Sequence, residues 1–136
     1  MKTLIVTLEN GDENDLFAVV KGDGFVYSTA GNNETEIRDN LKDLITDFLE
    51  NEGKDMKVWD GITANDIEFE FVYDLSAFFD TFEAIKISSL AKNAGINQSL
   101  MRQYATGSKQ PSVQQAKKIE MAIHQLGQSL MNVRVC

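Results

Sequence analysis

Hydrophobic residues in the first part of the chain follow the pattern of short strands joined by tight turns. Residues 2–8, KTLIVTL, alternate between apolar and polar types and carry β-branched side chains. Turn-forming residues at 10–15 separate them from a second apolar run at 16–21, and glycines within 22–24 precede a third run at 25–28. The pattern predicts a hairpin that continues into a three-stranded meander.

The meander ends at residues 31–33, and the apolar residues that follow it have the spacing of a helix. It predicts an amphipathic helix with Thr35 as its N-cap and Gly53 as its stop. Residues 67–73, IEFEFVY, alternate again and predict a fourth strand. The first domain is therefore expected to have the order β-β-β-α-β over residues 1–74. The apolar residues of its helix recur at steps of three and four: Ile37, Leu41, Leu44, Ile45, Phe48 and Leu49.

From residue 75 onward the apolar residues recur with the period of a helix. This predicts an all-α second domain over residues 75–136 and makes the fold class α+β. Its first helix has Asp74 or Ser76 as its expected cap, and Ser112 is expected to cap its last helix. The first helix is predicted to place Leu75, Phe78, Phe79, Phe82 and Ile85 on one apolar face, with the three phenylalanines in the core. The last helix is predicted to turn Val113, Ala116, Ile119, Ile123 and Leu126 inward.

Charge divides the chain at the same place. Residues 1–74 carry 18 acidic and 6 basic side chains, whereas residues 75–136 carry 3 acidic and 7 basic ones. The net charge of −8 for the whole chain therefore averages a half of −12 and a half of +4. The second half suits a polyanion such as nucleic acid, and the first half repels one.

Short helices that cross at a sharp turn are predicted at residues 88–104, SSLAKNAGINQSLMRQY. Ala91 is small where the second helix approaches the first, and Gly95 suits the positive φ of the turn. Met101 and Tyr104 follow ten and thirteen residues after Ala91. The shared core is completed by Leu90, Ala94, Ile96 and Leu100.

Polar side chains on the second of these helices suit base recognition. Asn97 is expected to be its N-cap, and four side chains then face away from Met101 and Tyr104. Gln can pair bidentately with adenine, and Arg with guanine, in the major groove. The residues predicted to contact bases are Gln98, Ser99, Arg102 and Gln103.

A polar loop follows at residues 106–111 and leads to the last helix. Its side chains and the amides at the start of that helix suit hydrogen bonds to phosphates, which would set the register of the protein on a duplex. The residues predicted to contact phosphates are Asn97, Thr106, Ser108, Lys109, Gln110 and Ser112.

The block LAKNAGINQSLMRQYATGSKQPS resembles the phage-repressor-type (Xre/Cro-type) helix-turn-helix, whose usual form is LA-x-x-x-G-[VI]-x-Q-x-x-[VI]-x-x-x-x-x-G. The small residue, the turn glycine, the Gln after the cap, the apolar residue ten positions on and the later glycine all coincide. The resemblance implies a sequence-specific transcriptional regulator that binds double-stranded operator DNA.

The first domain is similar to that of the HicB-type antitoxins, many of which carry such a DNA-binding domain behind it. The shared features are the β-β-β-α-β order, a short glycine turn and an acidic helix start at residues 33–36. The resemblance implies a partial ribonuclease-H-like sheet that lacks catalysis and binds a small basic ribonuclease toxin through its acidic surface. The protein would then be the antitoxin of a type II toxin-antitoxin pair that represses its own operon.

Other functions stay open beside this one. The main alternative is a free-standing repressor whose acidic N-terminal domain senses a small molecule or mediates oligomerisation. RNA is less favoured than duplex DNA because the basic half lacks an aromatic platform for single strands. The glycines at 22–24 are more simply a turn than a phosphate-binding loop.

Catalysis is not expected, and no cofactor or metal is expected either. His124 is the only histidine, and no Cys/His pair has the spacing of metal ligands. Asp23, Glu34, Asp66 and Glu68 could form a two-carboxylate nuclease site, but acidic residues are so numerous that solvated charge is the better interpretation.

A homodimer or higher oligomer is expected, because one recognition helix buries too little surface for operator affinity. Residues 129–135, SLMNVRV, alternate at period two and predict a dimerisation strand across a two-fold axis. No apolar run is long enough to span a membrane, the N-terminus lacks a signal-peptide pattern, and Cys136 has no second cysteine to pair with, so a cytoplasmic location is expected.

Overall fold

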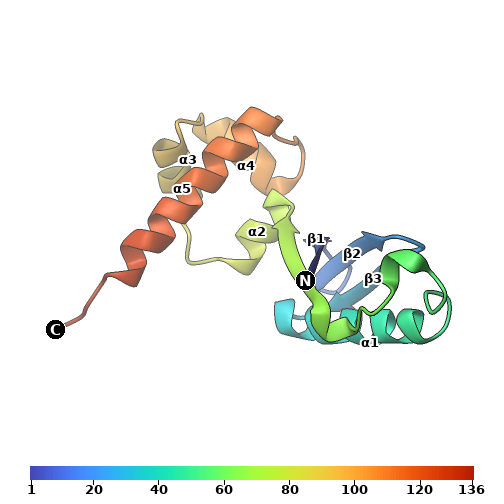
Figure 1. The fold of residues 1–136 in the computed structure, drawn as a ribbon. Helices are drawn as coiled ribbons and strands as arrows, with labels where there is room; N and C mark the ends of the chain where they lie inside the picture. Colours follow the sequence, from blue (N-terminus) through green and yellow to red (C-terminus); the bar gives the residue numbers. More distant parts are fainter. The chain divides into compact units, whose positions relative to one another are not determined.

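The computed structural model describes the whole chain, Met1–Cys136, and has an α+β fold with a four-stranded mixed sheet (Figure 1). The chain divides into two compact units, the N-terminal unit Met1–Ala77 and the C-terminal unit Phe78–Cys136. The boundary expected from the sequence, between residues 74 and 75, lies close to this division. Helix α2 (Leu75–Thr81) contains the division.

The N-terminal unit holds the four strands, and each strand predicted within residues 1–74 is present. They are β1 (Lys2–Asn10), β2 (Leu16–Gly22), β3 (Phe25–Gly31) and β4 (Ile67–Tyr73). The order in the sheet is β3-β2-β1-β4. β1 pairs antiparallel with β2, β2 pairs antiparallel with β3, and β4 returns to pair parallel with β1.

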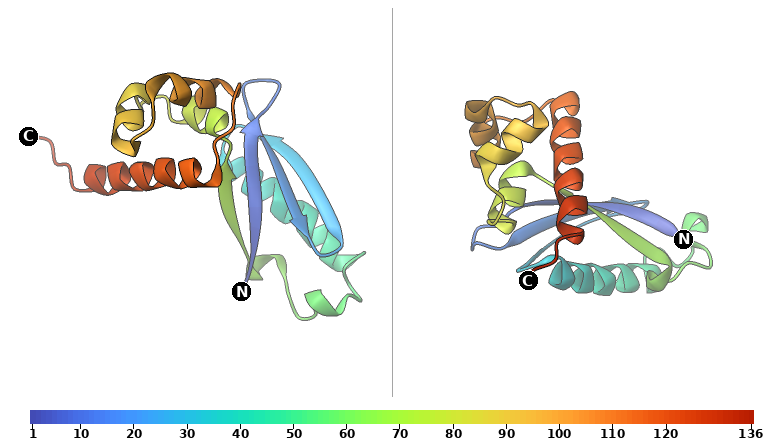
Figure 2. Two further views of the ribbon diagram at one scale, coloured as in Figure 1. Left: turned by 90° about the horizontal axis from the view of Figure 1, so that it is seen from above. Right: turned by 90° about the vertical axis from the view of Figure 1, so that its left-hand side faces the viewer.

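One face of the sheet is covered by α1 (Glu34–Glu50), which lies along it in both views of Figure 2. Alternation in β1 turns Leu4, Val6 and Leu8 toward the helix, and all three are buried. The predicted stripe of α1 meets them, because Ile37, Leu41, Ile45 and Phe48 are its buried residues. This apolar layer between one helix and one sheet face is the core of the N-terminal unit.

The ends of α1 differ from the prediction in one detail. Asn33, not Thr35, is the N-cap: its Oδ1 accepts a hydrogen bond from the Glu36 amide at 2.9 Å. The Glu36 carboxylate in turn accepts from the Asn32 amide at 2.8 Å, so the acidic start of the helix closes the loop before it. Gly53 follows the end of the helix and donates its amide to the Phe48 carbonyl.

Short segments join α1 to β4 and close the edge of the core. They are the 3₁₀ turns η1 (Lys57–Trp59) and η2 (Ala64–Asp66). Trp59 is buried, its Nε1 donates to the Asp23 carbonyl at 2.7 Å, and the Lys2 ammonium lies 4.2 Å from its ring centroid. The indole therefore ties this connection to the turn between β2 and β3.

A polar contact joins β4 to the start of α1. The Tyr73 hydroxyl donates to the Glu34 carboxylate, and burial together with that carboxylate raises the pKa of Tyr73. Because the phenol stays protonated at neutral pH, it acts as a hydrogen-bond donor and adds no charge to the core.

The C-terminal unit is helical after α2, with α3 (Ile87–Ala94), α4 (Gln98–Thr106) and α5 (Val113–Met131). Its apolar residues meet where α3 packs against α4 and α5. The buried residues of these elements and of the turn between α3 and α4 are Leu90, Ala91, Ala94, Ile96, Met101, Tyr104, Ile119 and Ala122. No helix of the protein has both the length and the apolar character that crossing a membrane requires.

The apolar faces of two helices differ from the predicted ones. The helix predicted through Ile85 ends at Thr81, and Phe82 beyond it is 41% exposed, although Phe78 and Phe79 are buried as expected. Val113, in the first turn of α5, is 85% exposed, and Ala116 is exposed too. The inward stripe of α5 starts later than predicted, because the helix packs against α3 and its buried residues are Ile119 and Ala122, beyond its first turn.

The structure also differs from the strand predicted over residues 129–135. Residues 129–131 are the last helical residues of α5, and residues 132–136 form no strand. The alternation of SLMNVRV is compatible with either structure over so short a run, and its first three residues continue the helix of α5.

Gly95 is predicted to be replaceable by Asn at a lower cost than by Ala. Its φ is +70°, and a Cβ there would meet no atom within 4 Å, so the cost of a side chain is conformational and not steric. Gly95→Ala is expected to destabilise the protein by about 1 to 2 kcal/mol. Gly95→Asn should cost less because Asn tolerates the left-handed region. Urea unfolding followed by circular dichroism measures both, and equal losses for Ala and Asn would contradict the assigned backbone conformation.

Candidate nucleic-acid interface

The turn between α3 and α4 sets the direction in which α4 leaves α3. Gly95 adopts the left-handed conformation as the C-cap of α3, and the amide of Ile96 donates to the Ala91 carbonyl at 2.9 Å. Ala91 has no exposed surface, so a larger side chain would have no space there. The small residue and the turn glycine predicted from the sequence have the roles expected of them.

Asn97 is the N-cap of α4, as predicted. Its Oδ1 accepts hydrogen bonds from the amide of Ser99 at 2.9 Å and from the amide of Leu100 at 3.3 Å. The acceptor of the Asn97 side chain is therefore used by the helix, and its Nδ2 group is left as the donor that can reach outward.

One face of α4 is buried and the other is open to solvent. Met101 and Tyr104 are the buried residues of the helix, at 0% and 5% exposure. Because they lie three positions apart, they hold the helix by one side and fix its rotation about its own axis. The four side chains predicted to contact bases all lie exposed on the remaining surface: Gln98, Ser99, Arg102 and Gln103.

The loop after α4 folds back onto the end of that helix. Gly107 caps α4 with a φ of 83°. The carbonyl of Gln103 then accepts hydrogen bonds from Thr106 Oγ1 at 3.2 Å, Ser108 Oγ at 3.3 Å and the Lys109 amide at 3.2 Å. Two residues predicted to contact phosphates, Thr106 and Ser108, thus direct their hydroxyl protons to the protein's own backbone.

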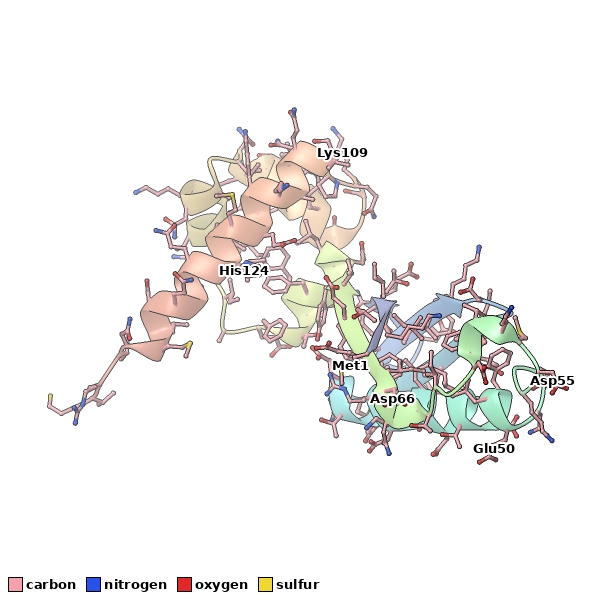
Figure 3. The ribbon with its side chains drawn as sticks, in the orientation of Figure 1. Met1, Glu50, Asp55, Asp66, Lys109 and His124 are labelled. Atoms are coloured by element: carbon pink, nitrogen blue, oxygen red, sulfur yellow. The ribbon has the colours of Figure 1, made fainter.

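Exposed side chains nevertheless remain along this loop. Lys109 and Gln110 are exposed, and Lys109 projects from the part of the unit where α5 begins (Figure 3). Ser112 caps α5 by accepting from the Gln115 amide at 3.2 Å, which leaves its hydroxyl proton able to donate outward. The first turns of α4 and α5 both belong to the C-terminal unit, and the first turn of α5 is the positive end of that helix's dipole.

The charges of the two units have opposite sign. The C-terminal unit carries 7 basic and 3 acidic side chains, and the N-terminal unit carries 6 basic and 18 acidic ones. Figure 3 labels Lys109 on the first of these and Glu50, Asp55 and Asp66 on the second. Within the C-terminal unit, the face formed by α4 and the following loop contains Arg102 and Lys109 and no carboxylate.

Three of the carboxylates named above as an alternative nuclease site have separate partners in the N-terminal unit. Glu34 accepts from Tyr73, and Asp23 lies 3.9 Å from the Lys2 ammonium. Asp66 accepts from the amide of Thr63 at 2.9 Å and from its hydroxyl at 3.1 Å, and these hydrogen bonds lower the pKa of Asp66. No three His, Cys, Asp or Glu side chains are placed to share a metal ion.

A second exposed surface, on the sheet, was not predicted. The face of the sheet opposite α1 is formed by the alternate residues of each strand, and it carries exposed apolar side chains: Ile5 57%, Phe17 37%, Val26 62% and Val72 46%. Glu68 and Glu70 of β4 lie beside Thr3 and Ile5 of β1 on the same face. The signal was present in the sequence, because both alternating positions of these strands include apolar residues.

Comparisons of this chain with models of protein families, with curated proteins and with solved structures found no match.

Asn97→Ala is predicted to destabilise the protein by about 1 kcal/mol, because two amides at the start of α4 lose their acceptor. Asn97→Asp should keep the stability, since a carboxylate caps a helix as well as an amide does. Thermal unfolding followed by circular dichroism compares the two variants. An Asn97→Ala variant as stable as the wild type would show that the cap contributes nothing, and equal losses for Asp and Ala would show that a carboxylate does not replace the amide oxygen.

Proposed function

We propose that this protein is a sequence-specific DNA-binding transcriptional regulator whose α4 enters the major groove as the recognition helix of a helix-turn-helix. The observation that supports this most directly is the exposed face of α4. It combines Gln98, Ser99, Arg102 and Gln103 on a helix whose rotation is held by Met101 and Tyr104, in a unit of net charge +4.

The chemistry of that face fits base edges. The Arg102 guanidinium offers two parallel donors to the acceptors of guanine, and the amides of Gln98 and Gln103 offer a donor and an acceptor to adenine. Ser99 is short and can donate or accept, which suits the side of the helix closest to the groove floor. Rigid placement matters because a bidentate contact requires both hydrogen bonds to be made at once.

The residues around this face divide into two roles. Lys109, Gln110, the Asn97 Nδ2 group and the Ser112 hydroxyl are proposed to contact phosphates, because each is exposed and has a donor that the fold does not use. Thr106 and Ser108 are proposed to act mainly through the loop, whose shape they hold by their bonds to the Gln103 carbonyl.

The N-terminal unit is proposed to bind a small basic protein, so that the whole chain is an antitoxin of the HicB type. Its 18 acidic side chains suit a basic partner, and the open face of its sheet offers exposed apolar residues beside Glu68 and Glu70. Together the two units would neutralise a basic ribonuclease toxin and repress the operon that encodes both proteins.

Arg102→Ala is expected to cost about 1 to 3 kcal/mol of binding to the operator and to relax base preference. Arg102→Lys keeps the charge but loses the guanidinium fork, so it should lose specificity while retaining most binding to random duplex. Gel retardation of a promoter fragment and of a random duplex measures both. If the wild type retards neither DNA in dilute salt, the proposed function is wrong.

Lys109→Ala is expected to weaken binding to all duplexes alike and to reduce the slope of log affinity against log salt by about one. The control is Arg102→Ala, which should discriminate between the two duplexes where Lys109→Ala does not. Identical profiles for the two variants would mean that the base-contacting and phosphate-contacting roles are wrongly assigned.

Glu70→Lys is expected to weaken binding of the basic protein encoded beside this gene, because it reverses a charge on the open face of the sheet. Glu50→Lys makes the same change on α1, which covers the opposite face, and should have a smaller effect. Co-purification and isothermal titration with the neighbouring gene product test the pair. An operon without a small basic companion would refute the antitoxin proposal and leave the DNA-binding proposal intact.

A further inference from the structure

Strand β3 forms one edge of the sheet and turns half of its main-chain groups away from the neighbouring strand. The order β3-β2-β1-β4 leaves one side of β3 without a partner strand (Figure 2). Gly22 pairs with Phe25 across a two-residue turn, so that pair and every second pair after it exchange hydrogen bonds. The main chain of the residues between these pairs therefore points outward. Those residues are Val26, Ser28 and Ala30, and all three are exposed.

Native sheets usually protect such an edge, and β3 lacks most of the features that do so. It contains no proline and no charged residue, and its register with β2 is continuous, without a bulge. Asn40 of α1 covers one end, because its Nδ2 donates to the Ala30 carbonyl at 3.1 Å and to Thr29 Oγ1 at 3.2 Å. The outward main-chain groups of Val26 and Ser28 have no such cover, so a further strand can pair with them.

The side of α1 next to this edge is acidic. Asn40 identifies that side, because it bonds to β3. Three exposed carboxylates follow it at steps of three, four and three residues, which places them on the same side of the helix: Asp43, Asp47 and Glu50. Arg38 and Lys42, the basic residues of α1, lie on the other side, and Arg38 is over the ring of Phe71 in β4.

These carboxylates follow the length of β3, because α1 runs back along that strand. Gly31 at the end of β3 lies against Ile37 in the first turn of α1. Phe25 at the start of β3 contacts Phe48 near the end of α1, with ring centroids 4.8 Å apart. Carboxylates four residues apart on a helix are separated by about 6 Å, close to the distance of about 7 Å between alternate side chains of a strand. A strand added at this edge can therefore place a basic residue opposite each carboxylate.

We propose that the β3 edge binds an extended, basic segment of another protein, which adds a strand to the sheet. The main chain of the segment pairs with Val26 and Ser28, and basic side chains at every second position face the carboxylates of α1. A second copy of β3 does not suit this edge, because it would bring another row of carboxylates to the same face. The edge is a different surface from α4 and from the open face of the sheet, so its binding requires neither of the functions proposed for them.

NMR of the full chain, titrated with a synthetic peptide as long as β3, seven residues, in which Lys and Val alternate, tests this site. In the free chain the amides of Val26 and Ser28 should exchange quickly with solvent and that of Tyr27 slowly, and bound peptide should slow the first two. Methylating the amides of either the lysines or the valines keeps the charge of the peptide. One methylated peptide should lose binding and the other keep it, because only alternate amides of an added strand face β3.

Ser28→Pro and Ser28→Ala are the matched pair of variants. Proline removes an N–H that β2 does not use, so the fold is retained while binding weakens at least about tenfold, and alanine leaves binding unchanged. Asp43→Lys should weaken binding about fivefold, and Glu68→Lys, on β4 at the other edge of the sheet, should have a smaller effect. This second pair leaves β3 unaltered, so it decides the question if Ser28→Pro does not fold.

Slow exchange of Val26 and Ser28 in the free chain overturns the proposal, because a second copy or another contact would then already cover the edge. Equal binding of the two methylated peptides overturns it too, since charge alone would explain the binding. The same holds if the peptide does not bind, if a folded Ser28→Pro binds as the wild type does, or if Asp43→Lys and Glu68→Lys lose equally. None of these outcomes depends on DNA or on the neighbouring gene product, so a failure here is separable from a failure of the proposed function.

Discussion

The burial of Met101 and Tyr104 is the constraint on which the exposed face of α4, proposed to bind DNA, depends. A helix as short as α4 has little stability of its own, so its position is decided by the side that packs. Because those two side chains are in the core, the polar residues of the helix are exposed to solvent. The turn at Gly95 and the absence of a side chain larger than a methyl at position 91 allow that packing, and the Asn97 cap starts the helix at the right residue.

Hydrogen bonds to one carbonyl extend this constraint into the loop. The Gln103 carbonyl receives two hydroxyls and one amide from the four residues before Gln110. The loop therefore has a defined shape next to the exposed face of α4, and the backbone of Lys109 is held by one of these hydrogen bonds. Thr106 and Ser108, predicted from the sequence to contact phosphates, are thus hydrogen-bonded to the protein's own backbone, while Lys109 and Gln110 beside them are exposed.

The surfaces of the N-terminal unit depend on the alternation of side chains along its strands. Alternation in its strands separates a face that packs on α1 from a face that stays open, and the return of β4 beside β1 places acidic residues next to apolar ones on the open side. Acidic side chains keep that surface soluble, and apolar ones make it able to associate. The two units thus differ in charge, in the kind of surface they expose and in the class of partner proposed for each.

The sequence alone determined the strands, the α1 stripe, the turn at Gly95 and the caps at Asn97 and Ser112, because each of these depends on residues close together in the chain. Period, cap and turn chemistry are local properties. The tertiary structure alone decided which turn of α5 packs, that Phe82 lies beyond the end of α2, and that Thr106 and Ser108 bond to the backbone. It also decided the open face of the sheet and the parallel pairing of β4 with β1. Those features depend on contacts between segments far apart in the chain, or on where along its length one element packs against another. A local sequence pattern carries no information about either.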